Sequence, residues 1–251
     1  MPFEAVTDSL DSPVRETAPA DAGPPARDRS SPRLVAYELV VSLPLLAAIA
    51  LAIFSNPQDF ASPMLLVWAV GIAAIDLMPL PLTSNMHFSL SFPLQLAVAL
   101  LYPPFVAGAV ALVGTSDPRE FRLQISPLKA LFIRAQIGVS VVVEAALFHS
   151  VASVDSIWYL IGVAVVVATL AGYAVNVGLV AGYVAIARRL PMRRVIAEMH
   201  EGILGELVIS YMGLAIFGVV IATFFVEAGL VSLVVFVAPL MFARQMFART
   251  H

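Results

Sequence analysis

The sequence contains no cysteine and has few charged residues. Without cysteine, disulfides, thiolate metal sites and cysteine nucleophiles are excluded. Soluble domains carry about 25% charged residues, whereas 12% of these 251 residues are charged and 60% are apolar. The composition therefore predicts an integral membrane protein whose main surroundings are the lipid bilayer.

Several chemical signatures are also missing. There is no Gly-rich phosphate loop, no nucleophile elbow, no metal-ligand motif and no pair of intramembrane carboxylates. The basic residues are divided among segments that flank the apolar runs, so they form no nucleic-acid surface. We therefore expect no enzyme activity, no cofactor, no metal and no nucleic-acid partner. Residues 1–32 lack a long apolar run and are rich in proline, which predicts a disordered cytoplasmic tail.

Seven apolar runs follow this tail. A helix needs about 20 residues to cross a bilayer, so residues 33–251 are expected to form a single membrane domain. We predict an all-α, polytopic transmembrane helical bundle with about six full spans and a short, proline-broken hairpin at residues 88–116. The runs cover residues 34–54, 64–82, 90–115, 130–151, 157–187, 207–225 and 230–247.

The distribution of charge decides how the third run crosses the membrane. All basic residues lie before the first run, after the third, after the fifth or at the C-terminus. The charged residues of the loops at 55–63, 152–156 and 226–229 are all acidic. Cytoplasmic loops are enriched in Lys and Arg. The four basic clusters share one side only if the third run enters and returns, which makes both termini cytoplasmic. The turn is expected at Tyr102, Pro103 and Pro104.

This hairpin has short arms, of about 22 and 18 Å as helices, against a hydrocarbon core of about 30 Å. Residues 87–95 alternate apolar and polar side chains, which indicates an extended entry. Irregular backbone in lipid must be buried in protein or line a cavity, so we expect an enclosed turn. Discontinuous segments often build binding sites near the midplane, and simple packing is the alternative.

Polar side chains inside apolar runs are unfavourable in lipid, which makes them the candidates for a ligand site. Glu144 is the strongest, because it lies among valines and alanines; a single interhelical hydrogen bond is the alternative. Asp76 lies near the cytoplasmic end of the second run, where it could accept amide hydrogens freed by a nearby proline. Asn176 and Tyr173 lie near one face of the fifth run and fit either helix packing or ligand binding. Gln95 lies on the first arm of the hairpin.

Small residues recur at four-residue spacing in the fifth run. Such strips let another helix approach closely, and both internal packing and homodimerisation fit them. The two strips are Ala164, Ala168 and Gly172, and Ala174, Gly178 and Gly182.

Two features lie at the expected cytoplasmic interface. Residues 192–203 alternate apolar and charged side chains at helical spacing, which predicts an amphipathic helix on the membrane surface. Its basic start suits anionic lipid, and docking of a partner is the alternative. Glu38 is expected to reach the interface or to pair with Arg33.

Four segments carry a resemblance to a known family. They are residues 77–82 (LMPLPL), 88–96 (FSLSFPLQL), 128–136 (LKALFIRAQ) and 238–247 (APLMFARQMF). Together with the proline-broken helix pair, they resemble the N-terminal multi-pass sensor domain of bacterial HD-GYP phosphodiesterases and GGDEF cyclases. The chain departs from that family where Ile133 and Arg134 replace a usual Asn, and it carries no HD or GGDEF signature.

The resemblance implies a sensory module in the bacterial inner membrane that acts through a cytoplasmic signalling partner, or a fragment of a larger signalling protein. A weaker likeness is to the substrate-binding membrane subunits of energy-coupling-factor vitamin transporters. That likeness implies a small metabolite held from outside and a transport partner on the cytoplasmic face. Both expectations remain open at this point.

Overall fold

The computed structural model describes residues 31–77, 91–201, 204–231 and 234–236, and all regular structure in these ranges is helical. The all-α prediction is confirmed for them, while the predicted tail and most of the last apolar run lie outside them. The elements are α1 (Pro32–Ser55), η1 (Pro57–Phe60), α2 (Met64–Asp76), α3 (Phe92–Leu101), α4 (Pro104–Gly114), α5 (Pro118–Phe121), α6 (Pro127–Val151), α7 (Trp158–Arg188), α8 (Met192–His200) and α9 (Leu204–Ala228).

Four of the described helices are long and apolar enough to cross a membrane, namely α1, α6, α7 and the Ile209–Ala228 part of α9. The prediction of about six full spans is confirmed only to this extent. The helix of the second run ends at Asp76, so α2 has 13 residues. At about 1.5 Å per residue it measures about 20 Å, too short for a core of about 30 Å.

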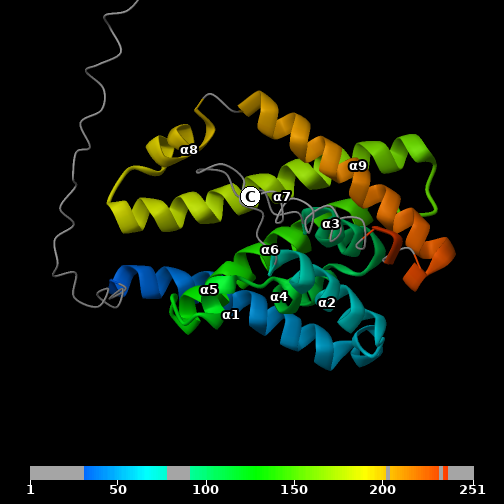
Figure 1. The fold of residues 1–251 in the computed structure, drawn as a ribbon, viewed down its shortest axis with the longest axis horizontal. Coiled ribbons are helices and arrows are strands. Elements are labelled where there is room, and N and C mark those ends of the chain that lie inside the picture. Colours follow the sequence, from blue (N-terminus) through cyan, green and yellow to red (C-terminus); the bar gives the residue numbers. More distant parts are fainter. Residues whose placement is uncertain (1–30, 78–90, 202–203, 232–233, 237–251) are drawn as a thin grey trace, which may run out of the picture.

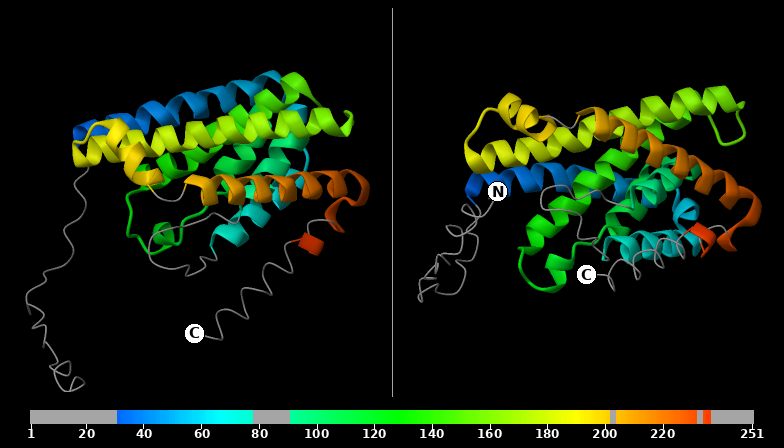
Figure 2. Two further views of the ribbon diagram at one scale, coloured as in Figure 1. Left: turned by 90° about the horizontal axis from the view of Figure 1, so that it is seen from above. Right: turned by 45° about the horizontal axis from the view of Figure 1, so that its top comes forward.

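The bundle has two chemically different ends. Figure 1 shows the start of α1, α5, the end of α7 and α8 at one end, and the α6–α7 loop and the end of α9 at the other. The described Arg and Lys residues belong to the first of these ends, which we call the basic end. Asp59, Asp155 and Glu227 belong to the other, which we call the acidic end. Figure 1 and Figure 2 show the start of α1 close to the end of α7 at the basic end, and Figure 1 shows the two helices diverging towards the acidic end.

The predicted hairpin is present, as α3 and α4. Tyr102 and Pro103 separate the two helices. Tyr102 has an extended backbone, as the residue before a proline usually has. Its carbonyl oxygen accepts a hydrogen bond from His149 Nε2 at 3.0 Å. The turn therefore lies beside the end of α6, at the acidic end, where the charge argument requires it.

Two details of this hairpin differ from the predictions. The turn is not enclosed, because Pro103 is exposed and Phe105 is 40% exposed. The predicted extended entry is wrong for residues 92–95, which are already helical. Pro93 lies in the first turn of α3, where helix amides need no partner, so it starts the helix without breaking it. Residues 87–90 lie outside the described residues.

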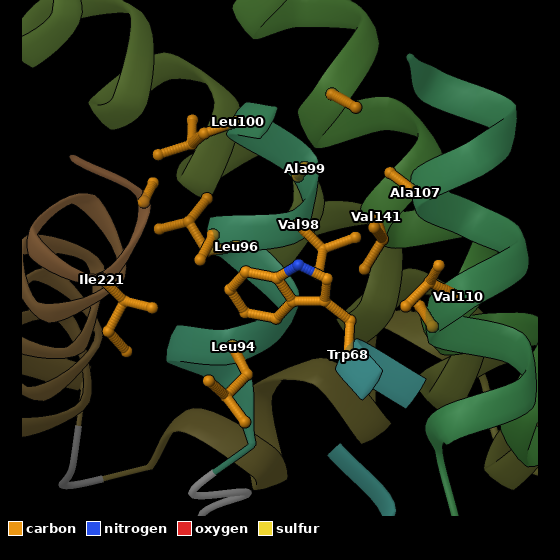
Figure 3. Packing of buried hydrophobic residues seen from close by; sticks show 14 of the residues in the cluster. Trp68, Leu94, Leu96, Val98, Ala99, Leu100, Ala107, Val110, Val141 and Ile221 are labelled. Carbon is orange, nitrogen blue, oxygen red and sulfur yellow. The ribbon is translucent and has the colours of Figure 1, made fainter. Parts of the chain in front are cut away.

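The enclosed part of the hairpin is α3, whose residues 92–100 are all buried. The helices α2, α4, α6 and α9 surround it, and Figure 3 shows Leu94 and Leu96 among these neighbours. Trp68 of α2 is completely buried, and its ring centroid lies 4.9 Å from that of Phe225 of α9. An enclosed helix presents no backbone to lipid, so a segment too short to span the bilayer is tolerated here.

Glycines bring α2, α4 and α6 close together. A β-carbon on Gly108 would lie 3.2 Å from the carbonyl oxygen of Gly138, so α4 and α6 approach nearly to backbone contact. A β-carbon on Gly114 would lie 2.9 Å from the carbonyl oxygen of Ala69 in α2. These contacts position the second arm of the hairpin.

The predicted packing strip on α7 is only partly used. Gly182 lies against Tyr37 of α1, but Ala174 is exposed, and a β-carbon built on Gly178 has no atom of another described segment within 4 Å. The prediction of internal packing is therefore wrong for Ala174 and Gly178. A four-residue step advances about 40° beyond a full turn, so the strip winds away from the other helices. The other predicted strip on α7, at residues 164, 168 and 172, is buried.

Candidate functional site

Glu144 lies in α6 and is 3% exposed. Its carboxyl group points at α7, because a β-carbon on Gly172 would overlap with it. Its Oε2 has no hydrogen-bond partner among the described residues, and it forms no ion pair with a described basic side chain. A buried carboxyl group of this kind can bind a proton, a cation or a hydrogen-bond donor of a ligand.

Two tyrosines lie near the turn of α7 that faces this carboxyl group. Tyr173 follows Gly172 directly in α7. Tyr211 of α9 packs against Tyr173. Its ring centroid lies 5.0 Å from that of Tyr173 of α7 and 4.8 Å from that of Phe92 of α3. We call Glu144, Tyr173 and Tyr211 the Glu144 cluster. Four helices therefore meet at one layer of the bundle.

Tyr173 also links the Glu144 cluster to α8. Its hydroxyl oxygen lies 2.5 Å from Nε2 of His200, and Nδ1 of the same ring lies 2.7 Å from the carbonyl oxygen of Ile196. A carbonyl oxygen only accepts, so Nδ1 carries the hydrogen of the neutral ring and Nε2 accepts from the tyrosine. Sequence reasoning missed this bond, because no pattern within α8 identifies a partner 27 residues away.

The other predicted residues on α3 and α7 lie apart from this bond. Gln95 is buried, but its Nε2 donates to Ser91 Oγ at 3.0 Å, within the same segment. Asn176 lies one turn beyond Gly172, and its Oδ1 is buried without a partner among the described residues. Glu144 therefore faces the turn of α7 that contains Gly172 and Tyr173, Asn176 lies one turn further along α7, and Gln95 is bonded within its own segment.

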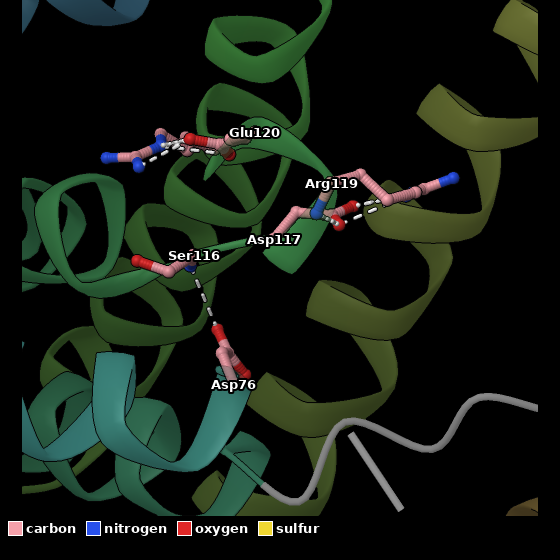
Figure 4. A network of polar contacts seen from close by, with 6 residues as sticks. Asp76, Ser116, Asp117, Arg119 and Glu120 are labelled. Atoms are coloured by element: carbon pink, nitrogen blue, oxygen red, sulfur yellow. Dashed lines mark hydrogen bonds and ion pairs between the residues drawn. The ribbon is translucent and has the colours of Figure 1, made fainter. Parts of the chain in front are cut away.

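Asp76, the last residue of α2, lies beside the segment that leads into α5 (Figure 4). Its Oδ2 accepts a hydrogen bond from the amide of Ser116 at 3.3 Å, which ties α2 to the end of the hairpin. The prediction concerned amides freed by Pro79, which lies outside the described residues; the donor seen here is 40 positions away in the sequence. Arg134, which departs from the family pattern, forms an ion pair with Glu120 of α5 at 2.7 Å.

The helix α8 is amphipathic, as predicted. Val195 is buried on the side that packs against α7, whereas Arg193 and Arg194 are exposed. Arg194 Nε donates to Glu198 Oε1, one turn further on, at 3.0 Å. The His200 bond therefore holds a helix whose other side presents charges at the basic end.

Comparison with known proteins adds no relative to this description. No family model, no curated protein and no solved structure matches the chain. Within the described ranges, no three His, Asp or Glu side chains are grouped so that they could hold a metal ion.

Proposed function

We propose that this chain is a membrane sensory or regulatory module, in which a small ligand at the Glu144 cluster changes the position of α8. The observation that carries the proposal is the hydrogen bond between Tyr173 and His200. A ligand that moves Glu144 or Tyr173 would alter the Tyr173–His200 hydrogen bond, which holds α8 against α7. The ligand shifts this equilibrium if it binds the two positions of α8 with different affinity.

The expected output is a cytoplasmic signalling partner that contacts the charged side of α8. The resemblance to the membrane sensor domains of cyclic-di-GMP signalling proteins supports this direction of signalling. The alternative is a substrate-binding subunit of a small-metabolite transporter. It is favoured by the buried Gln95–Ser91 pair, because a polar ligand could exchange hydrogen bonds with it.

Purification of the tagged chain in mild detergent tests this function. The unmodified chain is expected to retain a cytoplasmic signalling protein. Tyr173→Phe removes one hydroxyl group and its hydrogen bond to α8, so retention should change about 2- to 10-fold. Tyr159→Phe, at the exposed acidic end of the same helix, is the matched control.

Three outcomes of this experiment can be distinguished. A changed retention in Tyr173→Phe alone supports the proposed link to α8. An equal effect in both variants contradicts it. Co-purification of an ATPase, together with thermal stabilisation by a metabolite, would favour the transporter subunit instead.

We further propose that the basic end faces the cytoplasm of a bacterial cell and that both termini are cytoplasmic. Because the chain has no cysteine, single cysteines report the topology directly. Asp59→Cys, Asp155→Cys and Glu227→Cys are expected to react with a membrane-impermeant thiol reagent in intact cells. Arg119→Cys is expected to stay unlabelled, and its labelling would contradict this orientation.

A further inference from the structure

Polar side chains follow the contacts between α1, α6 and α7. On α6 they recur at every fourth residue, which places them along one stripe of the helix. On α7 they lie about one turn to either side of Gly172, the glycine that faces Glu144. On α1 the single member lies on the buried face. We call this set the polar seam, and its members are Ser42 on α1, Gln136, Ser140 and Glu144 on α6, and Thr169 and Asn176 on α7.

The three helices α1, α6 and α7 contact one another pairwise. α6 meets α7 at Glu144, as described above. α6 meets α1 where a β-carbon on Gly138 would lie 2.8 Å from the side chain of Leu45. α1 meets α7 where the hydroxyl group of Tyr37 donates to the carbonyl oxygen of Leu179 at 3.0 Å.

The polar residues of α6 and α7 lie at matching heights along the axis of the bundle. The two helices are antiparallel (Figure 1). One turn back from Glu144 along α6 is Ser140, and one turn forward from Gly172 along α7 is Asn176. Both steps run about 6 Å towards the basic end. The polar groups on the two helices therefore continue side by side.

The seam continues to the basic end along α1. Since Leu45 meets Gly138, Ser42 and Gln136 both lie within about one turn of that contact on its basic side. Glu38 lies a further turn towards the basic end and is completely buried, so the prediction that it reaches the interface is wrong. Polar side chains thus extend from the first turns of α1 to Glu144 and beyond it.

Several atoms of the seam have no hydrogen-bond partner among the described protein groups. Ser42, Glu144 and Thr169 are at most 3% exposed. A buried polar atom without a hydrogen bond costs about 1–3 kcal/mol, and lipid offers no substitute partner. Water molecules that donate to these acceptors remove that cost. The atoms without a partner among the described residues are Ser42 Oγ, Gln136 Oε1, Glu144 Oε2, Thr169 Oγ1 and Asn176 Oδ1.

We propose that the polar seam is a hydrated path from the basic end to Glu144, and that Glu144 exchanges a proton with water through it. A hydronium ion gives one proton to a carboxylate oxygen of Glu144 and becomes a water molecule; the reverse step returns the proton. This inference goes beyond the proposed function, because it requires neither a partner protein nor an organic ligand.

Single cysteines test the access of water to the seam. Ser42→Cys and Ser140→Cys replace a small hydroxyl side chain by a thiol of similar shape. In detergent, both are expected to react with a small water-soluble thiol reagent about tenfold or more faster than cysteines in the dry core, because thiol reactivity follows solvent access. Ala145→Cys and Ala168→Cys are the matched dry controls, since both positions are 0% exposed and belong to the apolar core.

The control set decides between a hydrated and a dry seam. Ser55→Cys, at the exposed end of α1, shows that the reagent is active. If Ser42→Cys and Ser140→Cys react as slowly as the Ala145 and Ala168 variants while Ser55→Cys reacts, the seam is dry and the proposal is overturned.

Infrared spectroscopy of the unmodified protein tests the proton step independently of any cysteine variant. The carbonyl band of the Glu144 carboxylic acid is identified as the band that disappears in Glu144→Gln. In acidic buffer this band is expected, and transfer to heavy water should shift it within the mixing time. A band that stays unshifted after prolonged exchange, or no such band at any pH, would overturn the proposal.

Discussion

Gly172→Ala is expected to destabilise the bundle by about 1–3 kcal/mol, as overpacking of a well-packed interior does. The new β-carbon would occupy the space of the Glu144 carboxyl group, so this buried side chain would have to move to another position. The free energy of unfolding, measured by denaturant titration in detergent, is the readout. The same substitution should also disturb the Tyr173–His200 bond, because Tyr173 follows this glycine directly.

Gly178→Ala provides the control on the same helix. A β-carbon there has no neighbour within 4 Å among the described residues, so the substitution should be neutral or stabilise the helix by about 0.5–1 kcal/mol. Glu144→Ala removes the group that overlaps, and the double variant should therefore lose less stability than the sum of the single changes, with a coupling of about 0.5–3 kcal/mol. Equal stability of the two glycine variants would show that Glu144 does not face Gly172.

The sequence predicted part of this site and missed the rest for a physical reason. Glu144, Tyr173 and Asn176 could be selected because each places a polar group within an apolar run. The roles of Tyr211 and His200 depend on how α9 and α8 fold back against α7, which no local pattern encodes. Those tertiary contacts join α7 to α8 and α9 next to the glycine that faces Glu144.

The fold shows a related limit. The distribution of basic residues was sufficient to predict a hairpin, because charge preference acts on each loop separately. It could not show that α3 is the enclosed arm. In lipid, an apolar surface is favourable against protein and against acyl chains alike, so hydrophobicity does not distinguish inside from outside. The same limit explains why internal packing was predicted for Ala174 and Gly178, which contact none of the other described helices.

The protein has two tryptophans, and their environments are opposite. Trp68 is 0% exposed in α2 and packs against Phe225, whereas Trp158 is 84% exposed at the start of α7. Trp68→Ala is expected to lower the free energy of unfolding by about 3–5 kcal/mol, because it leaves a cavity against α3 and α9. Trp158→Ala should change it by about 0.5 kcal/mol or less.

Each single-tryptophan variant carries its own fluorescent reporter, so both unfolding curves can be recorded by emission. Trp68→Phe fills part of the cavity and should lie between the unmodified protein and Trp68→Ala. Because Trp68 forms one wall around α3, its removal should loosen the enclosed arm of the hairpin and speed hydrogen exchange of amides such as that of Leu96. Equal losses of stability in the two alanine variants would mean that α3 is not enclosed and that its short length must be accommodated in another way.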